Sequence, residues 1–194
     1  MPAMPLGWFK KKEEEPTAVK PPAPPPTVVP SAAPPARPKS LSIGRLLRED
    51  MIVQPPSGLD KDGLVAFLVK TLCEKAGLGA PEPFLAKVLE REGGISTTLD
   101  TGLAVPHARM DGLVDIAAIL GLIPGGLGDP KQTDLTIRAV FLFFSPNRQE
   151  AFTQHLHLLR GVSTLFQPSF IEAALRDPSP AAVLKLIRDK ESAS

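Results

Sequence analysis

Apolar residues recur at helical spacing in the first half of the chain. Between residues 60 and 76 they repeat every three or four positions, at Leu64, Phe67, Leu68, Leu72 and Ala76. This spacing predicts an amphipathic helix that begins after an N-cap at Asp60 and ends at Gly77. A second helix is predicted over residues 82–92, ending at the glycine pair Gly93 and Gly94.

Two later segments have the continuous apolar character of buried strands. They are IAAILGLI at residues 116–123 and LTIRAVFLFFS at residues 135–145, and the glycine-rich PGGLGDPKQTD between them predicts a turn. Helical spacing returns over residues 152–166, and a short last helix is predicted over residues 181–187.

The order of these elements predicts the fold class. Before the first long helix, SIGRLLREDMIV predicts a helical turn that leads into a strand near residues 51–53. Helices therefore precede, separate and follow apolar strands, which favours an α/β domain. We expect a central mixed β-sheet covered by helices on both faces.

Proline divides the chain into two parts. Roughly half of the 23 prolines precede Lys39, in runs such as KPPAPPPTVVP that lack backbone donors. Residues 1–39 are therefore predicted to be a disordered Pro-rich tail and linker, and residues 40–190 a single folded domain.

Charge and cysteine content exclude several classes of function. The 22 basic and 21 acidic side chains nearly cancel, so no overall field draws the protein to nucleic acid or to an anionic membrane. No run is long enough to insert into a membrane. The single Cys73 and the absence of zinc-type Cys/His spacing favour a reducing cytoplasm, with no metal and no cofactor.

The segment REGGISTTLDTGLAVPH at residues 91–107 carries the candidate chemistry. A neutral imidazole at His107 is a good nucleophile that can carry a phosphoryl group, although a half-buried histidine at a strand end is an open alternative. Arg91 suits a clamp on phosphoryl oxygens or a cation at a helix end. Ser96 and Thr97 offer hydroxyl donors or simply form a turn. After His107, ARMDGL is expected to be a turn.

The other two histidines lie on the predicted helix over residues 152–166. His155 and His157 are two positions apart, so they point to nearly opposite sides and do not share a metal. The expected apolar stripe includes His155 and consists of Phe152, Leu156, Leu159, Ser163 and Phe166. His157 is expected to be solvated, whereas a buried His155 needs a polar partner. That partner would be a phosphoryl-bearing site or a backbone carbonyl.

The segment resembles the signature of the enzyme IIA domains of the phosphoenolpyruvate-dependent phosphotransferase system, in the fructose, mannitol and nitrogen-regulatory class. The pattern is met by Arg91, Glu92, Ser96, Thr97, Gly102, Ala104, Pro106 and His107. The resemblance covers most of residues 41–189, including VFLFFSP and HLHLL. The Pro-rich extension and the GGLGDP turn depart from the family pattern.

The resemblance implies a phosphohistidine carrier of the transferase class. His107 would accept a phosphoryl group from the histidine-containing phosphocarrier protein, Arg91 would stabilise its oxygens, and His155 would be the supporting histidine. The next partner would be an enzyme IIB domain in sugar transport or a regulated protein in the nitrogen branch. An alternative is a non-enzymatic binding module that recruits partners through the Pro-rich tail.

Overall fold

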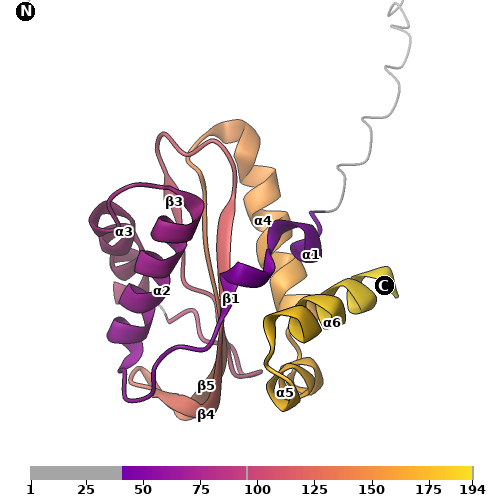
Figure 1. The fold of residues 1–194 in the computed structure, drawn as a ribbon. Coiled ribbons are helices and arrows are strands. Elements are labelled where there is room, and N and C mark those ends of the chain that lie inside the picture. The colour runs from indigo at the N-terminus through magenta and orange to yellow at the C-terminus, as the bar shows by residue number, and fades with distance from the viewer. Residues whose placement is uncertain (1–40, 95, 194) are drawn as a thin grey trace, which may run out of the picture. The chain divides into compact units, whose positions relative to one another are not determined.

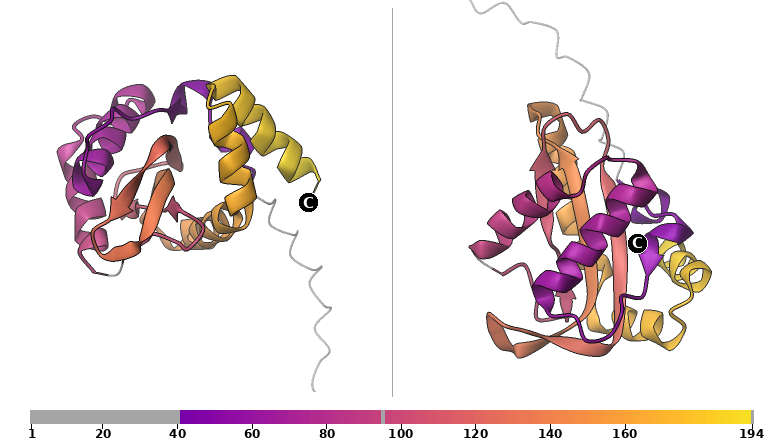
Figure 2. Two further views of the ribbon diagram at one scale, coloured as in Figure 1. Left: turned by 90° about the horizontal axis from the view of Figure 1, so that it is seen from below. Right: turned by 60° about the vertical axis from the view of Figure 1, so that its left-hand side comes forward.

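The computed structural model of the protein describes residues 41–94 and 96–193, which form a mixed five-stranded sheet with helices on both faces (Figures 1 and 2). The strands are β1 (Ile52–Val53), β2 (Leu103–Ala104), β3 (His107–Met110), β4 (Ala117–Asp129) and β5 (Gln132–Pro146). The helices are α1 (Ile43–Leu46), the 3-10 turn η1 (Glu49–Met51), α2 (Lys61–Ala76), α3 (Glu82–Gly93), α4 (Gln149–Leu165), α5 (Pro168–Arg176) and α6 (Pro180–Ser192). The predicted fold class is confirmed. The predicted tail over residues 1–39 lies outside the described residues and stays a prediction.

The long antiparallel pair β4–β5 forms the centre of the sheet. β1 pairs with β4 in parallel, and β2 and β3 both pair with β5 in parallel. Helices α2 and α3 lie on one side of this sheet, and α4, α5 and α6 lie on the other (Figures 1 and 2). Helices on both sides bury both faces of the central strands, which explains their continuous apolar sequences.

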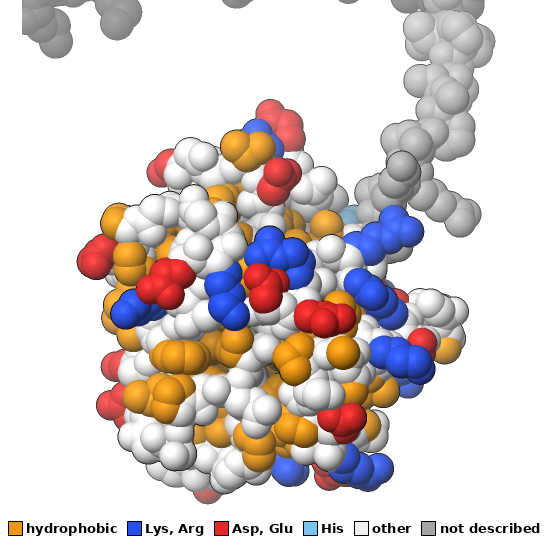
Figure 3. All heavy atoms as spheres, in the orientation of Figure 1, with side chains coloured by type: hydrophobic (Ala, Val, Ile, Leu, Met, Phe, Trp, Pro, Cys, Tyr) orange, Lys and Arg blue, Asp and Glu red, His pale blue; other side chains and the backbone are white. Residues whose placement is uncertain are grey.

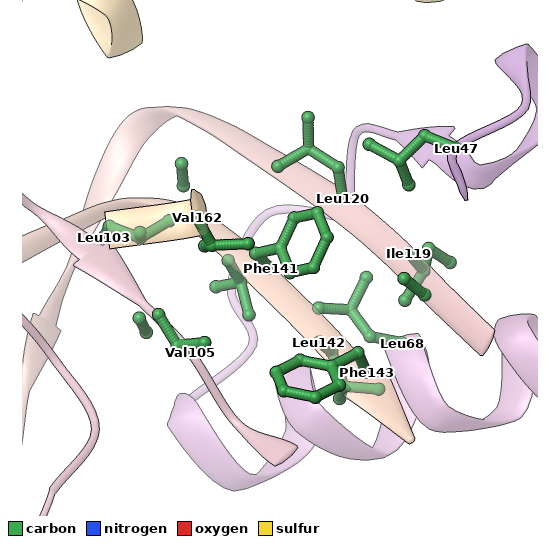
Figure 4. Packing of buried hydrophobic residues seen from close by; sticks show 14 of the residues in the cluster. Leu47, Leu68, Leu103, Val105, Ile119, Leu120, Phe141, Leu142, Phe143 and Val162 are labelled. Carbon is green, nitrogen blue, oxygen red and sulfur yellow. The ribbon is translucent and has the colours of Figure 1, made fainter. Parts of the chain in front are cut away.

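Alternating residues of β5 contribute to two cores. Phe141 contacts Phe166 at the end of α4, with ring centroids 5.8 Å apart, whereas Phe144 meets Phe84 of α3 at 4.8 Å. Figure 4 shows part of this packing, in which Phe141 lies near Val162 of α4. Each such aromatic side chain stabilises the folded state by about 1.5–3 kcal/mol when it is fully buried.

The ends of α2 are determined by local chemistry. The Asp60 side chain accepts a hydrogen bond from the Gly63 amide at 2.8 Å, and Gly77 closes the helix in the left-handed region at φ 65°. Both ends agree with the prediction, because an N-cap carboxylate and a left-handed glycine act within one turn of the helix. Helix α3 ends within one residue of its predicted boundary.

The start of the domain is tied to its last helix by one carboxylate. Glu191 of α6 accepts hydrogen bonds from the Ile43 and Gly44 amides at 2.6 and 3.1 Å and from the Ser42 hydroxyl at 2.8 Å. A carboxylate at a helix N-terminus satisfies donors that have no partner within the helix. The four-residue α1 is therefore stabilised from outside its own sequence.

The glycine-rich segment 124–134 contains the predicted turn only at residues 130–131, and its other residues are strand. β4 continues through it to Asp129, and β5 already begins at Gln132, so that Leu127 pairs with Ile137. The register shifts between Leu122 and Leu127, where the irregular ladder accommodates the proline and the glycines. Backbone pairing across the hairpin overrides the local turn preference of these residues.

The second half of the chain contains three further corrections. The sequence predicts no element between the helices over residues 152–166 and 181–187, yet α5 occupies Pro168–Arg176 and begins at a proline, a favoured first residue. The last helix is longer than predicted and covers Pro180–Ser192. The buried face of α4 differs from the predicted stripe and consists of Ala151, His155, Leu158, Val162 and Leu165. Phe152 and Leu156 are instead 41% and 47% exposed, because the docking of α4 buries a face one position away.

Lys and Arg side chains alternate with Asp and Glu side chains over the face seen in Figure 3. This mixture agrees with the formal net charge of +1. On this face no large area of one charge sign is seen (Figure 3).

Candidate functional site

His107 is placed by a short edge strand that Pro106 interrupts. β2 pairs with residues 139–140 of β5, and β3 pairs with residues 143–146 of the same strand. Between them, Pro106 has no N–H to donate, although its carbonyl oxygen accepts from the Phe143 amide at 3.2 Å. His107 is consequently the first residue of β3 and lies beside Phe143 in the register.

The turn before β2 requires the glycine of the motif. Gly102 has φ +83°, and a Cβ at this position would lie 3.1 Å from the Thr136 carbonyl oxygen. The Gly102 carbonyl oxygen accepts from the Arg138 and Ala139 amides of β5 at 2.8 and 3.2 Å. This glycine lets the turn approach β5 closely and thereby sets the position of the strand that leads to His107.

The His107 imidazole is held in one tautomer by the backbone. Its Nδ1 lies 2.7 Å from the Val105 carbonyl oxygen, which only accepts, so we assign the proton to Nδ1. The ring stacks on Phe143, with centroids 5.3 Å apart and planes 11° apart. Burial lowers the pKa of His107, and although the Val105 hydrogen bond opposes this, the charge of Arg91 lowers it further. The ring is therefore neutral at physiological pH, with a lone pair on Nε2.

His155 lies on the buried side of α4, as predicted, with 5% of its surface exposed. Its Nδ1 is 2.8 Å from the Ser145 hydroxyl of β5, and its ring centroid is 5.3 Å from that of His107. Burial lowers the pKa of His155 to about 4, and the charges of His107 and Arg109 contribute to the decrease. The fold thus brings together two neutral imidazoles from segments that are far apart in the sequence. His157 is exposed, also as predicted.

Arg91 lies exposed in the last turn of α3, where the sequence placed it. Its charge lowers the pKa of His107, so the guanidinium lies within electrostatic reach of the imidazole. The end of a helix also favours a cation, so this position suits both alternatives considered for Arg91.

Ser96 and Thr97 follow α3, and their hydroxyls bond to buried carboxylates. The Ser96 hydroxyl donates to Oδ2 of Asp129 at 2.8 Å, and the Thr97 hydroxyl donates to Oε1 of Glu92 at 2.5 Å. Among the described residues, none of the hydrogen bonds of these hydroxyls runs to His107. Binding of phosphoryl oxygens by Ser96 and Thr97 therefore stays a prediction.

A buried ammonium group joins these carboxylates. Nζ of Lys61 lies 3.1 Å from Oε2 of Glu92 and 2.9 Å from Oδ2 of Asp129, and all three residues are between 2% and 7% exposed. Burial alone would raise the pKa of Asp129. The hydrogen bonds that its carboxylate accepts from Thr98, Lys61 and other neighbours outweigh this effect, so the pKa lies below its usual value. This cluster of Lys61, Glu92 and Asp129 connects the start of α2, the end of α3 and the β4–β5 hairpin.

The sequence prediction missed Arg109, because it assigned residues 108–113 to a turn. In the structure β3 includes residue 109, and alternate strand residues share a face, so Arg109 lies on the same face as His107. Its Nη2 donates to the Arg148 carbonyl oxygen at 2.9 Å, and its guanidinium carbon lies 5.1 Å from the centroid of the Phe152 ring. Counting in steps of two from His107 would have identified this residue.

Other kinds of site have less support. Within residues 41–94 and 96–193, no group of three or more His, Cys, Asp and Glu side chains is placed to hold a metal ion. The same part of the chain contains no helix with the length and apolar content to span a membrane. An open cavity of about 660 Å³ is lined by Phe84, Met110 and neighbouring residues, and neither His107 nor His155 lines it. It is therefore separate from the histidine pair.

Comparison with protein sequences identifies related domains. Residues 45–190 match the sequence model of the family described as phosphoenolpyruvate-dependent sugar phosphotransferase system, EIIA 2. The chain is 26% identical over 156 residues to the 2-O-alpha-mannosyl-D-glycerate-specific EIIABC component of this system from Escherichia coli strain K12. The alignment covers 77% of the present chain but only 23% of that protein. The chain thus spans less than a quarter of the length of this relative.

Solved structures share the fold. The nitrogen regulatory protein IIA-Ntr of Neisseria meningitidis has a TM-score of 0.62 at 22% identity, covering 75% of this chain and 98% of that one. IIA mannitol of Escherichia coli has a TM-score of 0.60 at 22% identity, and the match covers 72% of this chain and 96% of that one. The same Escherichia coli domain, in a complex with phosphorylated enzyme IIB, has a TM-score of 0.60 at 20% identity. This match covers 74% of the present chain and 97% of that one. At these identities the likeness establishes the fold.

The neutral state of His155 predicts a loss of stability on acidification. Above pH 6.5 the imidazole is neutral in both the folded and the unfolded protein. Between about 6.5 and 4, the unfolded chain binds a proton that the folded protein does not. The free energy of unfolding should therefore fall as the pH decreases through this window. We expect urea unfolding to show a smaller pH dependence for His155→Gln than for the wild type.

The matched control for this experiment is His157→Gln, which changes an exposed histidine of the same helix and should retain the wild-type pH dependence. An NMR titration provides a direct check. A midpoint for the His155 ring near 6.5 instead of about 4 would contradict the expected effect of burial.

Removal of the buried ammonium group should destabilise the protein strongly. Lys61→Met leaves the Glu92 and Asp129 carboxylates close together and unpaired, which costs about 3–5 kcal/mol in a buried site. The measurement is the free energy of unfolding at pH 7. Lys70→Met, which changes an exposed lysine of the same helix, is the control and should lose at most about 1 kcal/mol. Equal losses for the two variants would show that the cluster is not stabilising.

Proposed function

The chain belongs to the EIIA type 2 family of the phosphoenolpyruvate-dependent sugar phosphotransferase system, and from this premise we propose that it carries a phosphoryl group on Nε2 of His107. The observation that carries the proposal is the state of this ring. The Val105 carbonyl oxygen holds the proton on Nδ1, and burial keeps the imidazole neutral. A neutral imidazole with a free ring nitrogen is a competent nucleophile.

The donor is the histidine-containing phosphocarrier protein. In the transfer, the Nε2 lone pair of His107 forms a bond to phosphorus while the bond between phosphorus and the donor ring nitrogen breaks. The electron pair of the broken bond returns to the donor imidazole, and the proton on Nδ1 of His107 stays in place. The step needs alignment and charge stabilisation, which the two docked proteins supply.

Arg91 and His155 support this step in different ways. Arg91 is a permanent cation whose charge reaches His107, and its guanidinium suits the phosphoryl oxygens. His155 is neutral and lies against His107, so it hydrogen-bonds the phosphoryl group or orients the acceptor ring. The Ser96 and Thr97 hydroxyls bond to carboxylates. We propose that these bonds hold the segment after α3 in place, and that the two hydroxyls reach the phosphoryl oxygens only after leaving the carboxylates.

The recipient is an enzyme IIB domain or a regulated protein. One structural relative is described in a complex with phosphorylated enzyme IIB, and another is described as a nitrogen regulatory protein. In either case the phosphoryl group adds about −1.5 to −2 charges close to His155 and the exposed Phe152 ring that stacks beside it, enough to change which partner binds. A pure binding module would have no need for a neutral nucleophile, so the histidine pair favours the carrier over that alternative.

Replacement of His107 should abolish phosphorylation. We expect the wild type, incubated with phosphoenolpyruvate, the general phosphotransferase enzyme and the phosphocarrier protein, to gain one acid-labile phosphoryl group by intact-mass analysis. His107→Ala should gain none, because the nucleophile is missing. His157→Ala, which removes an exposed histidine, is the matched control and should be labelled like the wild type. Full labelling of His107→Ala would refute the assignment.

Replacement of Arg91 should slow transfer without unfolding the domain. A charge-assisted hydrogen bond contributes about 1.5–3 kcal/mol, so Arg91→Ala should reduce the single-turnover rate by about 10- to 100-fold. Arg91 is exposed at a helix end, so the melting temperature should change little. A wild-type rate for this variant would exclude Arg91 from phosphoryl binding.

A further inference from the structure

A second arginine lies two residues after His107 on the same strand, β3. Arg109 shares a face of β3 with His107 and lies beside Ser145 in the parallel register with β5. The Ser145 hydroxyl bonds to Nδ1 of His155. Arg109 therefore starts from the strand position next to the group that holds His155.

The guanidinium of Arg109 is anchored at the edge of this site. Nη2 donates to the Arg148 carbonyl oxygen at 2.9 Å, and the group lies over the Phe152 ring. The Phe152 ring is nearly parallel to the His155 ring, at 9°, with centroids 6.4 Å apart. These contacts hold the cation close to the ring that flanks His107.

One buried donor of this guanidinium lacks an acceptor. Nε of Arg109 is buried and has no hydrogen-bond partner among the described residues. A buried donor without an acceptor carries a desolvation cost, so such an atom calls for a specific explanation. In this location, a ligand that brings an acceptor oxygen to the histidine pair would remove the cost.

The chemistry of the site requires more positive charge than Arg91 provides. A phosphoryl group on His107 carries about −1.5 to −2 charges. His155 is neutral at physiological pH because its pKa is lowered to about 4, so it does not supply a cation in the unphosphorylated protein. Arg91 is exposed and contributes one charge, weakened by solvent. A second guanidinium on the His155 side would balance the charge.

We propose that Arg109 is a second phosphoryl-binding residue, whose Nε–H donates to an oxygen of the phosphoryl group on His107 while Nη2 stays bonded to the Arg148 carbonyl. The proposal rests on the proposed function of His107 as the acceptor. Arg91 and Arg109 would then hold the phosphoryl oxygens from α3 and from β3, on two sides of the imidazole pair.

The first test measures phosphoryl transfer from the phosphocarrier protein. At a saturating donor concentration, Arg109→Gln should transfer about 10- to 100-fold more slowly than the wild type, which corresponds to the loss of one charge-assisted hydrogen bond. Arg109→Lys should recover part of the rate, since it restores the charge but not the Nε–H. The matched control is Arg160→Gln, an exposed arginine of α4, which should transfer at the wild-type rate. A wild-type rate for Arg109→Gln would overturn the proposal.

A second measurement distinguishes phosphoryl binding from simple bracing of β3 against α4. The wild type and Arg109→Gln are labelled chemically with phosphoramidate, a small donor that needs no partner protein, and the phosphoryl group is titrated by phosphorus NMR. Loss of an adjacent guanidinium should raise the pKa of the phosphoryl group, whereas a purely structural role would leave that pKa unchanged. An unchanged pKa would therefore overturn the proposal.

The two donors separate failure of this proposal from failure of the proposed function. If phosphoramidate labels His107 but the phosphocarrier protein does not, the relay is wrong and the titration still decides the role of Arg109. If neither donor labels His107, the acceptor assignment fails and the Arg109 proposal fails with it. If the wild type is labelled by both and Arg109→Gln matches it in rate and pKa, only the Arg109 proposal fails.

Discussion

The parallel pairing of β3 with the central strand β5 is the constraint on which the site depends. It places His107 beside Phe143 and Arg109 beside Ser145, and through Ser145 it reaches His155 of α4. Phe143 and the next residue of β5 are fully buried on opposite faces. If the strand pairing slipped by one residue, each side chain would move to the opposite face of the sheet. Packing in the two cores on either side of the sheet therefore fixes the register. The geometry of the histidine pair is therefore a consequence of core packing.

Burial determines the chemistry of the pair once its geometry is set. Two imidazoles with centroids 5.3 Å apart repel each other if both are protonated, and removal from water also disfavours the charged forms. The charges of two arginines also lower the imidazole pKa values, Arg91 that of His107 and Arg109 that of His155. As a result, the positive charge of the site resides on guanidinium groups, which stay protonated, while the imidazoles remain neutral.

The motif also has a structural side that faces away from the histidines. Arg91 and Glu92 are neighbours in the last turn of α3, yet Arg91 is exposed and Glu92 is 6% exposed. Glu92 pairs with Lys61, and Asp129 joins them from the β4–β5 hairpin. Adjacent residues of one signature thus serve different purposes. Arg91 provides positive charge that reaches the acceptor His107, and Glu92 anchors the end of the helix that carries Arg91.

Local chemistry in the sequence determined part of the fold and the identity of the motif. Asp60 and Gly77 bound α2 because capping acts within one turn, and the apolar runs marked β4 and β5 because burial on both faces leaves a continuous apolar sequence. The motif itself carried the family resemblance. The role of Lys61 was not accessible, because its partner Asp129 is distant in the chain. Strand alternation from His107 could have indicated Arg109, but not its place beside Ser145 of β5.

Tertiary structure alone decided which face of α4 is buried, where the glycine-rich hairpin pairs, and that Ser96 and Thr97 bond to carboxylates. The helical spacing placed His155 on the buried side but selected a stripe with Phe152, which is exposed. The physical reason is common to these cases. A helix cap or a turn is an interaction between residues a few positions apart, whereas strand register, helix docking and buried ion pairs depend on groups that only the folded chain brings together.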